Sequence, residues 1–273
     1  MPLSPKLLPA PVPGLAPGGV LGDVPDVDLS AVVADQPDPV LFATVSGAHL
    51  YGFPSRDSDV DLRGVHLLPA AALVGLREPE ETRTRMWDQD GVEMDLVTHD
   101  LRKFARLMLR PNGYVLEQLT SPLVAHTTDA HAELRALVPD VLTSHHAHHY
   151  RGFAGTQWRL FGKTGELKPL LYTYRALLTG IHLMRAGEIQ AHLPTLAGEV
   201  PEAPARLPGL IAVKADAEHG AADVPLDAVT AEIERLHQVL DAAQQASALR
   251  AEAPVADALH DLVVRVRLAH AEG

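Results

Sequence analysis

The chain has 273 residues, 47% of them hydrophobic, and a formal net charge of -12. This length allows one large domain or two modest ones, and the acidic balance argues against whole-surface, non-specific affinity for nucleic acid. The absence of cysteine excludes disulfides, thiolate metal sites and a cysteine nucleophile. No apolar run approaches the roughly 20 residues of a membrane span, so we expect a soluble, cytoplasmic protein.

Composition divides the chain into three parts. Residues 1–26 are rich in proline and glycine, which predicts a flexible arm. Residues 27–125 mix strand and helix patterns, whereas residues 126–273 show helical patterns almost throughout. We therefore predict an α+β protein in which an α/β domain over 27–125 precedes a mostly α-helical domain over 126–273.

The first half contains the strand patterns. After a short helix that begins near Asp26 or Asp28, we predict a buried strand over 39–45, a second strand over 59–67, a short helix over 70–76 and a hairpin over 82–98 with its turn at Asp90 and Gly91.

The second half contains the helix patterns. Asp100 and Asn112 have the side chains of N-cap residues and predict two helix starts. Further helices are expected over 131–137, 145–161, 168–186, 226–249 and 256–271. The segment 193–225, with its prolines, glycines and alanines, predicts a loop or linker.

Three aspartates are the candidate catalytic residues. Alternation places Asp59 and Asp61 on one face of their strand, opposite Val60 and Leu62. Asp is among the poorest strand formers, so two of them at this spacing need an explanation other than structure. Two such carboxylates suit a divalent cation, and Asp95 becomes a third ligand if its strand lies beside theirs.

The order of these motifs resembles the nucleotidyltransferase superfamily of DNA polymerase β. A small-residue turn at Ser46, Gly47 and Ala48 precedes the two alternating aspartates, and a lone acidic residue follows on a later strand. Within the superfamily, the sequence looks most like the bacterial branch associated with RNA-repair operons (RlaP-type). Further stretches similar to that branch are VEMDLVTHDLRKF (92–104), NGYVLEQL (112–119), YRGF (150–153) and KPLLYTYR (168–175).

The resemblance implies a polymerase-β-like domain, with a small mixed sheet flanked by helices, that transfers a nucleoside monophosphate from an NTP to an acceptor hydroxyl. It implies two Mg²⁺ or Mn²⁺ ions held by Asp59, Asp61 and Asp95. Asp95 would complete the metal that lowers the pKa of the acceptor hydroxyl, or would itself act as general base. The implied partners are the NTP and an RNA end or RNA-repair proteins.

The resemblance also implies a set of nucleotide-binding residues. On α-helical spacing, Lys168, Tyr172 and Arg175 share one face, which would point at the triphosphate. Arg63, on the strand face of the aspartates, would either neutralise them before metal arrives or contact phosphate. The remaining candidates lie in and after the glycine turn: Ser46, Gly47, His49 and Ser58.

Several alternatives stay open on the sequence alone. Ala48 stands where the superfamily usually has Ser or Gly, so the hydroxyl that would hold a triphosphate is absent there, and Ser46, Ser58 or backbone amides are its substitutes. The acceptor is alternatively a protein or a cationic small molecule, or the chain is a nucleotide-binding scaffold. The histidines between His145 and His149 suggest either a metal site or a surface or interface cluster.

Overall fold

The computed structural model describes residues 24–25, 27–216 and 220–271. The predicted arm over 1–26 therefore lies outside the described residues, except for Val24 and Pro25. No helix in the described ranges is both long and apolar enough to cross a membrane.

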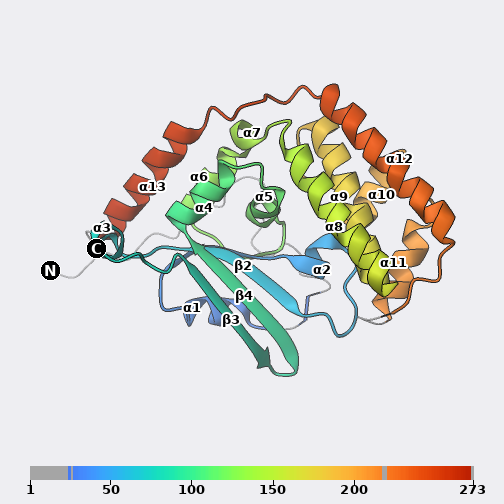
Figure 1. Cartoon of the computed structure of the whole chain (residues 1–273). Coiled ribbons are helices and arrows are strands. Elements are labelled where there is room, and N and C mark those ends of the chain that lie inside the picture. The colour runs from blue at the N-terminus through green and yellow to red at the C-terminus, as the bar shows by residue number, and fades with distance from the viewer. Residues whose placement is uncertain (1–23, 26, 217–219, 272–273) are drawn as a thin grey trace.

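The fold is α+β, as predicted, with a mixed sheet and helices on both of its faces (Figure 1). In chain order the elements are α1 (Leu29–Ala34), β1 (Val40–Val45), α2 (Gly47–Tyr51), β2 (Val60–His66), α3 (Ala70–Val74), β3 (Thr82–Gln89), β4 (Val92–Asp100), α4 (Leu101–Met108), α5 (Gly113–Thr120), β5 (Val124–His126), α6 (Asp129–Ala136), α7 (Val138–Val141), α8 (His146–Thr164), α9 (Leu167–Ala186), α10 (Leu193–Glu199), α11 (Leu207–Ala215), α12 (Leu226–Gln245) and α13 (Ala256–Ala271).

The five described strands lie in the order β3-β4-β2-β1-β5. β2 and β4 are parallel, and every other pair is antiparallel. β3 and β4 form the predicted hairpin, in which Asp90 has a left-handed φ of 55° and Gly91 one of 87°. The parallel pair is the feature that matters for function, because it brings the strand of Asp59 and Asp61 beside that of Asp95.

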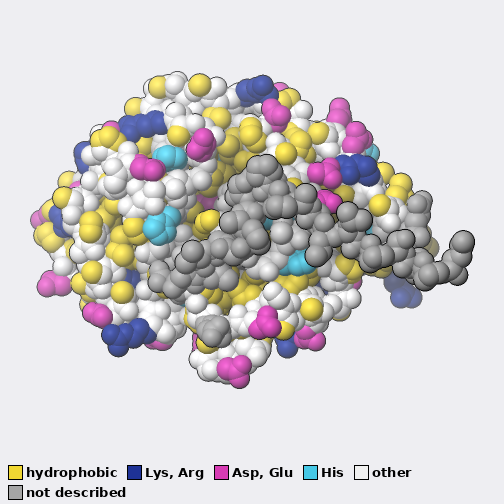
Figure 2. Space-filling view, turned by 180° about the vertical axis from the view of Figure 1, so that it is seen from behind, with side chains coloured by type: hydrophobic (Ala, Val, Ile, Leu, Met, Phe, Trp, Pro, Cys, Tyr) yellow, Lys and Arg dark blue, Asp and Glu magenta, His cyan; other side chains and the backbone are white. Residues whose placement is uncertain are grey.

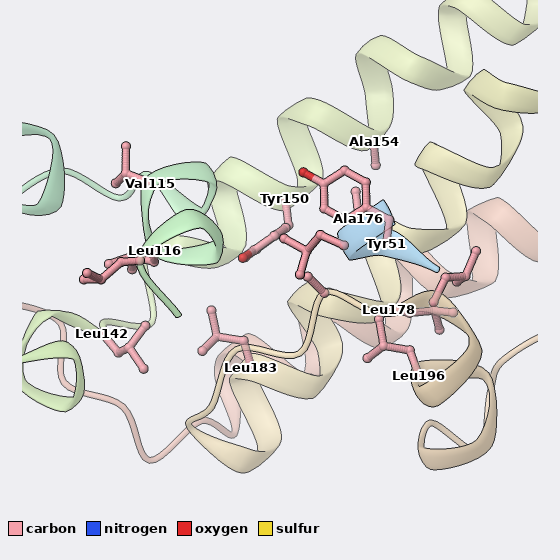
Figure 3. Packing of buried hydrophobic residues seen from close by; sticks show 14 of the residues in the cluster. Tyr51, Val115, Leu116, Leu142, Tyr150, Ala154, Ala176, Leu178, Leu183 and Leu196 are labelled. Carbon is pink, nitrogen blue, oxygen red and sulfur yellow. The ribbon is translucent and has the colours of Figure 1, made fainter. Parts of the chain in front are cut away.

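Two apolar layers bury the sheet. On one face, α1 packs Leu29, Val32 and Val33 against strand residues such as Leu62 and Leu96. On the other face, a larger core continues from Phe42 through α4, α5 and α6 into the helices of the second half. Figure 3 shows part of this core, where Tyr51 of α2 lies among residues of α8 and α9.

The loop prediction for 193–225 is wrong, because α10 and α11 lie within this segment. Two of the prolines behind that prediction, Pro194 and Pro208, lie in the first turns of these helices, where a missing N–H costs nothing. The His192 side chain accepts a hydrogen bond from the Thr195 N–H and caps α10. Buried Leu193 and Leu207 hold the two helices against the core.

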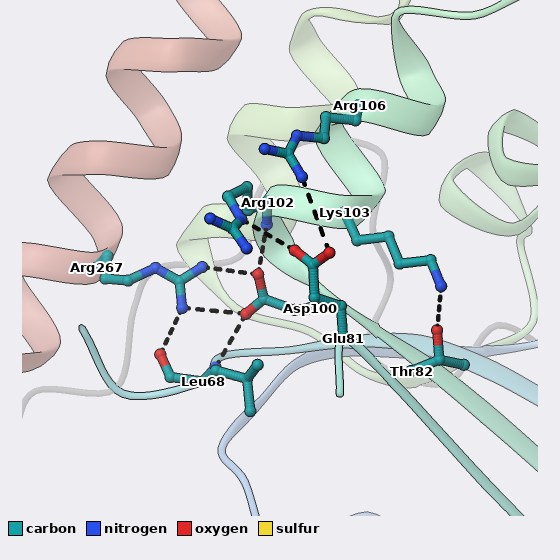
Figure 4. A network of polar contacts seen from close by, with 8 residues as sticks. All are labelled: Leu68, Glu81, Thr82, Asp100, Arg102, Lys103, Arg106 and Arg267. Carbon is teal, nitrogen blue, oxygen red and sulfur yellow. Dashed lines mark hydrogen bonds and ion pairs between the residues drawn. The ribbon is translucent and has the colours of Figure 1, made fainter. Parts of the chain in front are cut away.

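The last helix returns to the first half of the chain. In Figure 1, α12 leads into a long connection, and α13 lies at the far side, near α3 and α4. Arg267 of α13 forms two 3.0 Å contacts with the carboxylate of Asp100 and also donates to the Leu68 carbonyl (Figure 4). Asp100 also caps α4 through the Arg102 N–H, as the sequence predicts.

Candidate functional site

The three candidate aspartates meet at one end of the parallel strand pair. Asp61 and Asp95 are directly paired in the register of β2 and β4. Asp59 precedes β2 by one residue, and its charge raises the pKa of Asp61. The strand of Asp95 therefore lies beside that of Asp61, which is the condition on which Asp95 counts as the third carboxylate.

Arg63 lies between two of these carboxylates. Its Nη2 contacts Asp61 and lies 2.7 Å from Asp95 Oδ2, while Nη1 donates to the Asp95 carbonyl at 2.6 Å. Its Nε donates to the Tyr114 hydroxyl at 3.0 Å. Of the two placements expected for Arg63, the structure has the one that neutralises the aspartates.

The electrostatics of the site favour a cation. Burial raises the pKa of Asp61 from 3.8 to about 6; Arg63 opposes this shift, and Asp59 and Asp95 add to it. A partly buried group of negative charges is stabilised when a cation binds among them.

Carboxylate oxygens are the donors that Mg²⁺ and Mn²⁺ prefer, so the residue types fit a divalent metal. No group of three or more His, Asp and Glu side chains among the described residues is arranged to hold a metal ion. The Arg63 guanidinium stands between two of the candidate ligands instead. The three aspartates would therefore hold metal only once Arg63 has moved.

The glycine turn is fixed against β2. The Ser46 N–H donates to the Asp61 carbonyl at 2.8 Å, and Gly47 has a left-handed φ of 60°. A Cβ at position 47 would lie 1.8 Å from Asp61 Oδ2, so only glycine fits beside this carboxylate. Ala48 is buried in the hydrophobic core, which explains why a methyl group suits that position.

The other candidates near the turn have different surroundings. The Ser58 hydroxyl accepts from the Ser55 N–H at 2.9 Å, and Lys214 of α11 donates to the Ser55 hydroxyl at 3.0 Å. The buried Ser46 hydroxyl has no hydrogen-bond partner within the described part of the chain. His49 lines a separate cavity with residues such as His192, not the cavity next to Asp61.

A cavity of about 560 Å³ adjoins the aspartates and collects four of the predicted site residues: Gly47, Asp61, Tyr172 and Arg175. Its remaining lining comes from α2, α5 with its N-cap, and α8. The α9 face that we predicted to point across the site therefore does line this cavity at two of its three positions. The third residue, Lys168, is close enough to Asp61 for its charge to lower that pKa.

Arg175 forms a buried ion pair with Glu117. Its Nη1 lies 2.8 Å from Glu117 Oε1, and its guanidinium lies over the Tyr51 ring at 3.8 Å. The Tyr51 hydroxyl donates to Glu117 Oε2 at 3.1 Å. Arg175 thus builds the wall of the cavity through Glu117 and Tyr51.

Sequence reasoning missed the contribution of α8. His149, Phe153 and Gln157 line the same cavity, and their i, i+4 and i+8 spacing was a visible signal of a shared helix face. The expectation of surface or interface histidines holds for exposed His145 and His148 and is wrong for buried His146, while His149 is half-buried. His146 is buried against Thr143, and His149 faces the cavity.

Comparison with known proteins gives a family match and two curated relatives. The model of a family described as "RNA repair pathway DNA polymerase beta family" matches residues 22–265. Uncharacterised protein MJ0002 of Methanocaldococcus jannaschii is 31% identical over 157 residues. The match covers 55% of this chain and 63% of that protein, so this chain spans less than two thirds of that relative's length. Uncharacterised protein YcgL of Bacillus subtilis is 26% identical over 218 residues, covering 77% of this chain and 83% of that protein.

Among solved structures, a nucleotidyltransferase-like protein from Exiguobacterium sibiricum is similar over 80% of this chain and 72% of the chain of that protein. The two share 14% sequence identity, with a TM-score of 0.30.

Proposed function

Since this chain belongs to the RNA repair pathway DNA polymerase beta family, we propose that it is a metal-dependent nucleotidyltransferase that moves an NMP from an NTP to an acceptor hydroxyl. The observation that carries this proposal is the register pairing of Asp61 with Asp95, with Asp59 one residue before the strand. Three carboxylates at one end of a parallel strand pair, beside a glycine turn and a cavity, suit phosphoryl chemistry.

In the proposed reaction the acceptor oxygen attacks the α-phosphorus, the bond from that phosphorus to the bridging oxygen breaks, and pyrophosphate leaves. Two Mg²⁺ or Mn²⁺ ions held by Asp59, Asp61 and Asp95 would stabilise the charge on the attacking and leaving oxygens. Asp95 accepts the proton of the acceptor hydroxyl, directly or through water. Because Gly47 lacks a side chain, the β- and γ-phosphates can approach the turn beside Asp61.

Cationic side chains complete the proposed triphosphate site. Lys168 lies near enough to act electrostatically on Asp61 and is the proposed contact for the phosphates. With metal held by the aspartates, Arg63 would be released from Asp61 and Asp95 and would contact the phosphates, the second of its two expected roles. Ser46, His49 and Ser58 stay predicted contacts, and Arg175 and Tyr172 support the site from its wall.

For the acceptor, the family description favours an RNA end in an RNA repair pathway. A protein or cationic small molecule is the alternative that the net charge of -12 favours. On the face shown in Figure 2, basic side chains are scattered among acidic ones. An RNA end would be held near the aspartates, where the transfer takes place.

The experiment is transfer of label from each α-labelled NTP, with Mg²⁺ or Mn²⁺, to a panel of RNA oligonucleotides, to the protein itself and to a cell lysate. Asp61→Asn removes the charge while keeping the side-chain size. Asp57→Asn, which changes an exposed carboxylate in the preceding loop, is the matched control.

We expect label transfer by the wild type and by Asp57→Asn, and loss of at least about 100-fold in Asp61→Asn. Label on RNA supports the RNA acceptor, and label on protein or a small molecule supports the alternative. If no label moves to any acceptor while an NTP still binds, the chain is a nucleotide-binding scaffold and the proposal is wrong.

A further inference from the structure

The two edges of the sheet are built differently. β5 forms one edge with only three residues, and its pairing with β1 is irregular. β3 forms the other edge with eight residues, which pair one by one with β4 without a bulge. A short or irregular edge strand discourages pairing with another chain, whereas a long regular one offers a row of unpaired N–H and C=O groups. The β3 edge is therefore the one open to a further strand (Figure 1).

The middle of β3 exposes an apolar side chain. Met86 is 79% exposed, and the strand contains neither proline nor lysine, which commonly protect an edge. Its two arginines are held by acidic residues that follow α1, since Arg83 lies 3.2 Å from Asp38 and Arg85 lies 3.0 Å from Asp35. Both arginines are thus drawn toward the α1 side of the sheet and leave the edge itself unguarded.

Pairing of β3 with a second copy of itself has one favourable register. Directly opposed residues of an antiparallel pair lie on the same face, so a two-fold pair of identical strands is centred on one residue. Centring on Arg85 would oppose two arginines, and centring on Thr84 would oppose Arg83 and Arg85, whereas like charges directly opposite destabilise a sheet. Centring on Met86 pairs residues 83–89, the longest stretch of any register that opposes no like charges.

This register also joins complementary side chains. It sets Met86 against Met86 of the second copy, so that two exposed apolar side chains are buried together. On the α1 side it sets Arg85 opposite Trp87 of the other copy. The Arg85 guanidinium already lies 4.5 Å from the ring centroid of Trp87 in its own chain, which places both groups for cation–π contact across the pair.

We propose that β3 pairs antiparallel with β3 of a second copy of this chain, which joins two five-stranded sheets into one continuous sheet. Met86 is directly paired with Asp95 in the register of β3 and β4. The Asp95 residues of the two copies are therefore separated by three strand spacings, about 14 Å. Both candidate sites then open on the same face of the joined sheet. The dimer does not depend on the reaction that either site catalyses.

The first test is disulfide cross-linking, because a chain without cysteine reports the register through one introduced thiol. In Met86→Cys the two thiols face each other across the two-fold axis, and mild oxidation should link most of the full-length protein as a dimer. Thr84→Cys, at another exposed position of β3, is the matched control. Its two thiols would be offset by about 13 Å along the strands, so little of it should be linked. Non-reducing electrophoresis measures the linked fraction of each variant.

The second test is the mass of the full-length protein in solution, measured by size-exclusion chromatography with light scattering. The wild type should have twice the mass of one chain. Met86→Lys should have the mass of one chain, because it sets two ammonium groups opposite each other. Val213→Lys, at an exposed position of α11, is the control and should stay a dimer. Circular dichroism confirms that each variant folds.

Three results would overturn the proposed dimer. The first is a wild type with the mass of one chain. The second is a dimer that Met86→Lys leaves intact, because the two copies would then meet elsewhere. The third is equal cross-linking of Met86→Cys and Thr84→Cys, which would exclude the register centred on Met86.

Discussion

At the scale of single residues, Arg63 decides the state of the candidate site. Its guanidinium contacts Asp61 and Asp95, and its side chain is only 9% exposed. Removing one partner from such a buried group leaves the others as uncompensated charges. The alternation of Asp59, Asp61 and Arg63 along one strand indicated this proximity, but not that Arg63 would bridge to a second strand.

Arg63→Met should lower the free energy of unfolding by roughly 2–4 kcal/mol in the presence of a chelator, because Asp61 and Asp95 lose their counter-charge. Mn²⁺ should recover much of that loss, since a cation that binds only the folded state stabilises it. Thermal unfolding in EDTA and in Mn²⁺ measures both effects. Arg85→Met, at an exposed arginine of β3, is the control and should respond to neither condition. An identical deficit with and without Mn²⁺ would argue against a cation site at these aspartates.

His131 predicts a specific pH dependence of stability. Burial lowers its pKa from 6.5 to about 4, and it lies stacked on Phe42 with a centroid distance of 4.4 Å. Between pH 4 and 6.5 the unfolded chain binds more protons at this position than the folded chain, so the free energy of unfolding rises with pH across this window. The stabilisation is complete above pH 6.5 and is lost toward pH 4.

From pH 7.5 to pH 5, His131 should account for a loss of about 2 kcal/mol. Urea unfolding at the two pH values, for the wild type and His131→Gln, measures this contribution. The variant should lose less stability on acidification, whereas exposed His260→Gln should match the wild type. Parallel pH profiles of wild type and His131→Gln would contradict the burial argument.

At the scale of elements, the alternation of apolar residues and the N-cap residues predicted strands and helix starts correctly, whereas the composition of residues 193–225 did not predict the helices there. The strand over 59–67 and the hairpin over 82–98 were predictable because apolar residues alternate, and Asp100 and Asn112 do cap their helices. α10 and α11 were missed because proline at a helix start looks like a helix breaker on sequence alone. The cavity face of α8 was missed because its neighbours come from α5 and α9, and only tertiary packing brings these together.

The docking of α13 depends on one buried arginine. Arg267→Met should cost about 3–5 kcal/mol of unfolding free energy, because Asp100 is fully buried and would keep an unpaired charge. Arg265→Met is the matched control on the same helix, since its exposed pair with Glu133 contributes little. Chemical denaturation of both variants measures the difference. Similar stabilities for the two would show that α13 docks through its apolar residues alone.

At the scale of the whole molecule, the sheet and the helices share one core. The large apolar cluster runs from Phe42 of β1 to Leu262 of α13, and Tyr51 of α2 contacts Tyr172 of α9. The boundary predicted between residues 125 and 126 stays a prediction, and it would divide this cluster. No local pattern in the sequence could indicate that the two halves bury a common surface.

A shared core predicts that both halves unfold together. Circular dichroism reports mainly the helices, and the fluorescence of Trp87 in β3 reports the sheet. The thermal unfolding transitions measured by these two signals should coincide. Trp158 of α8 would mix the signals, so Trp158→Phe is the variant to measure, with circular dichroism confirming that it folds. Two separated transitions would indicate independently folding halves.

The reaction class is tested most directly by following the α-label and the γ-label of the NTP in parallel, with Mg²⁺ and the acceptor found by the transfer assay. Nucleotidyl transfer predicts that the α-label joins the acceptor and that the γ-label leaves as pyrophosphate. Transfer of the γ-label to the acceptor, or its release as orthophosphate, would contradict nucleotidyl transfer.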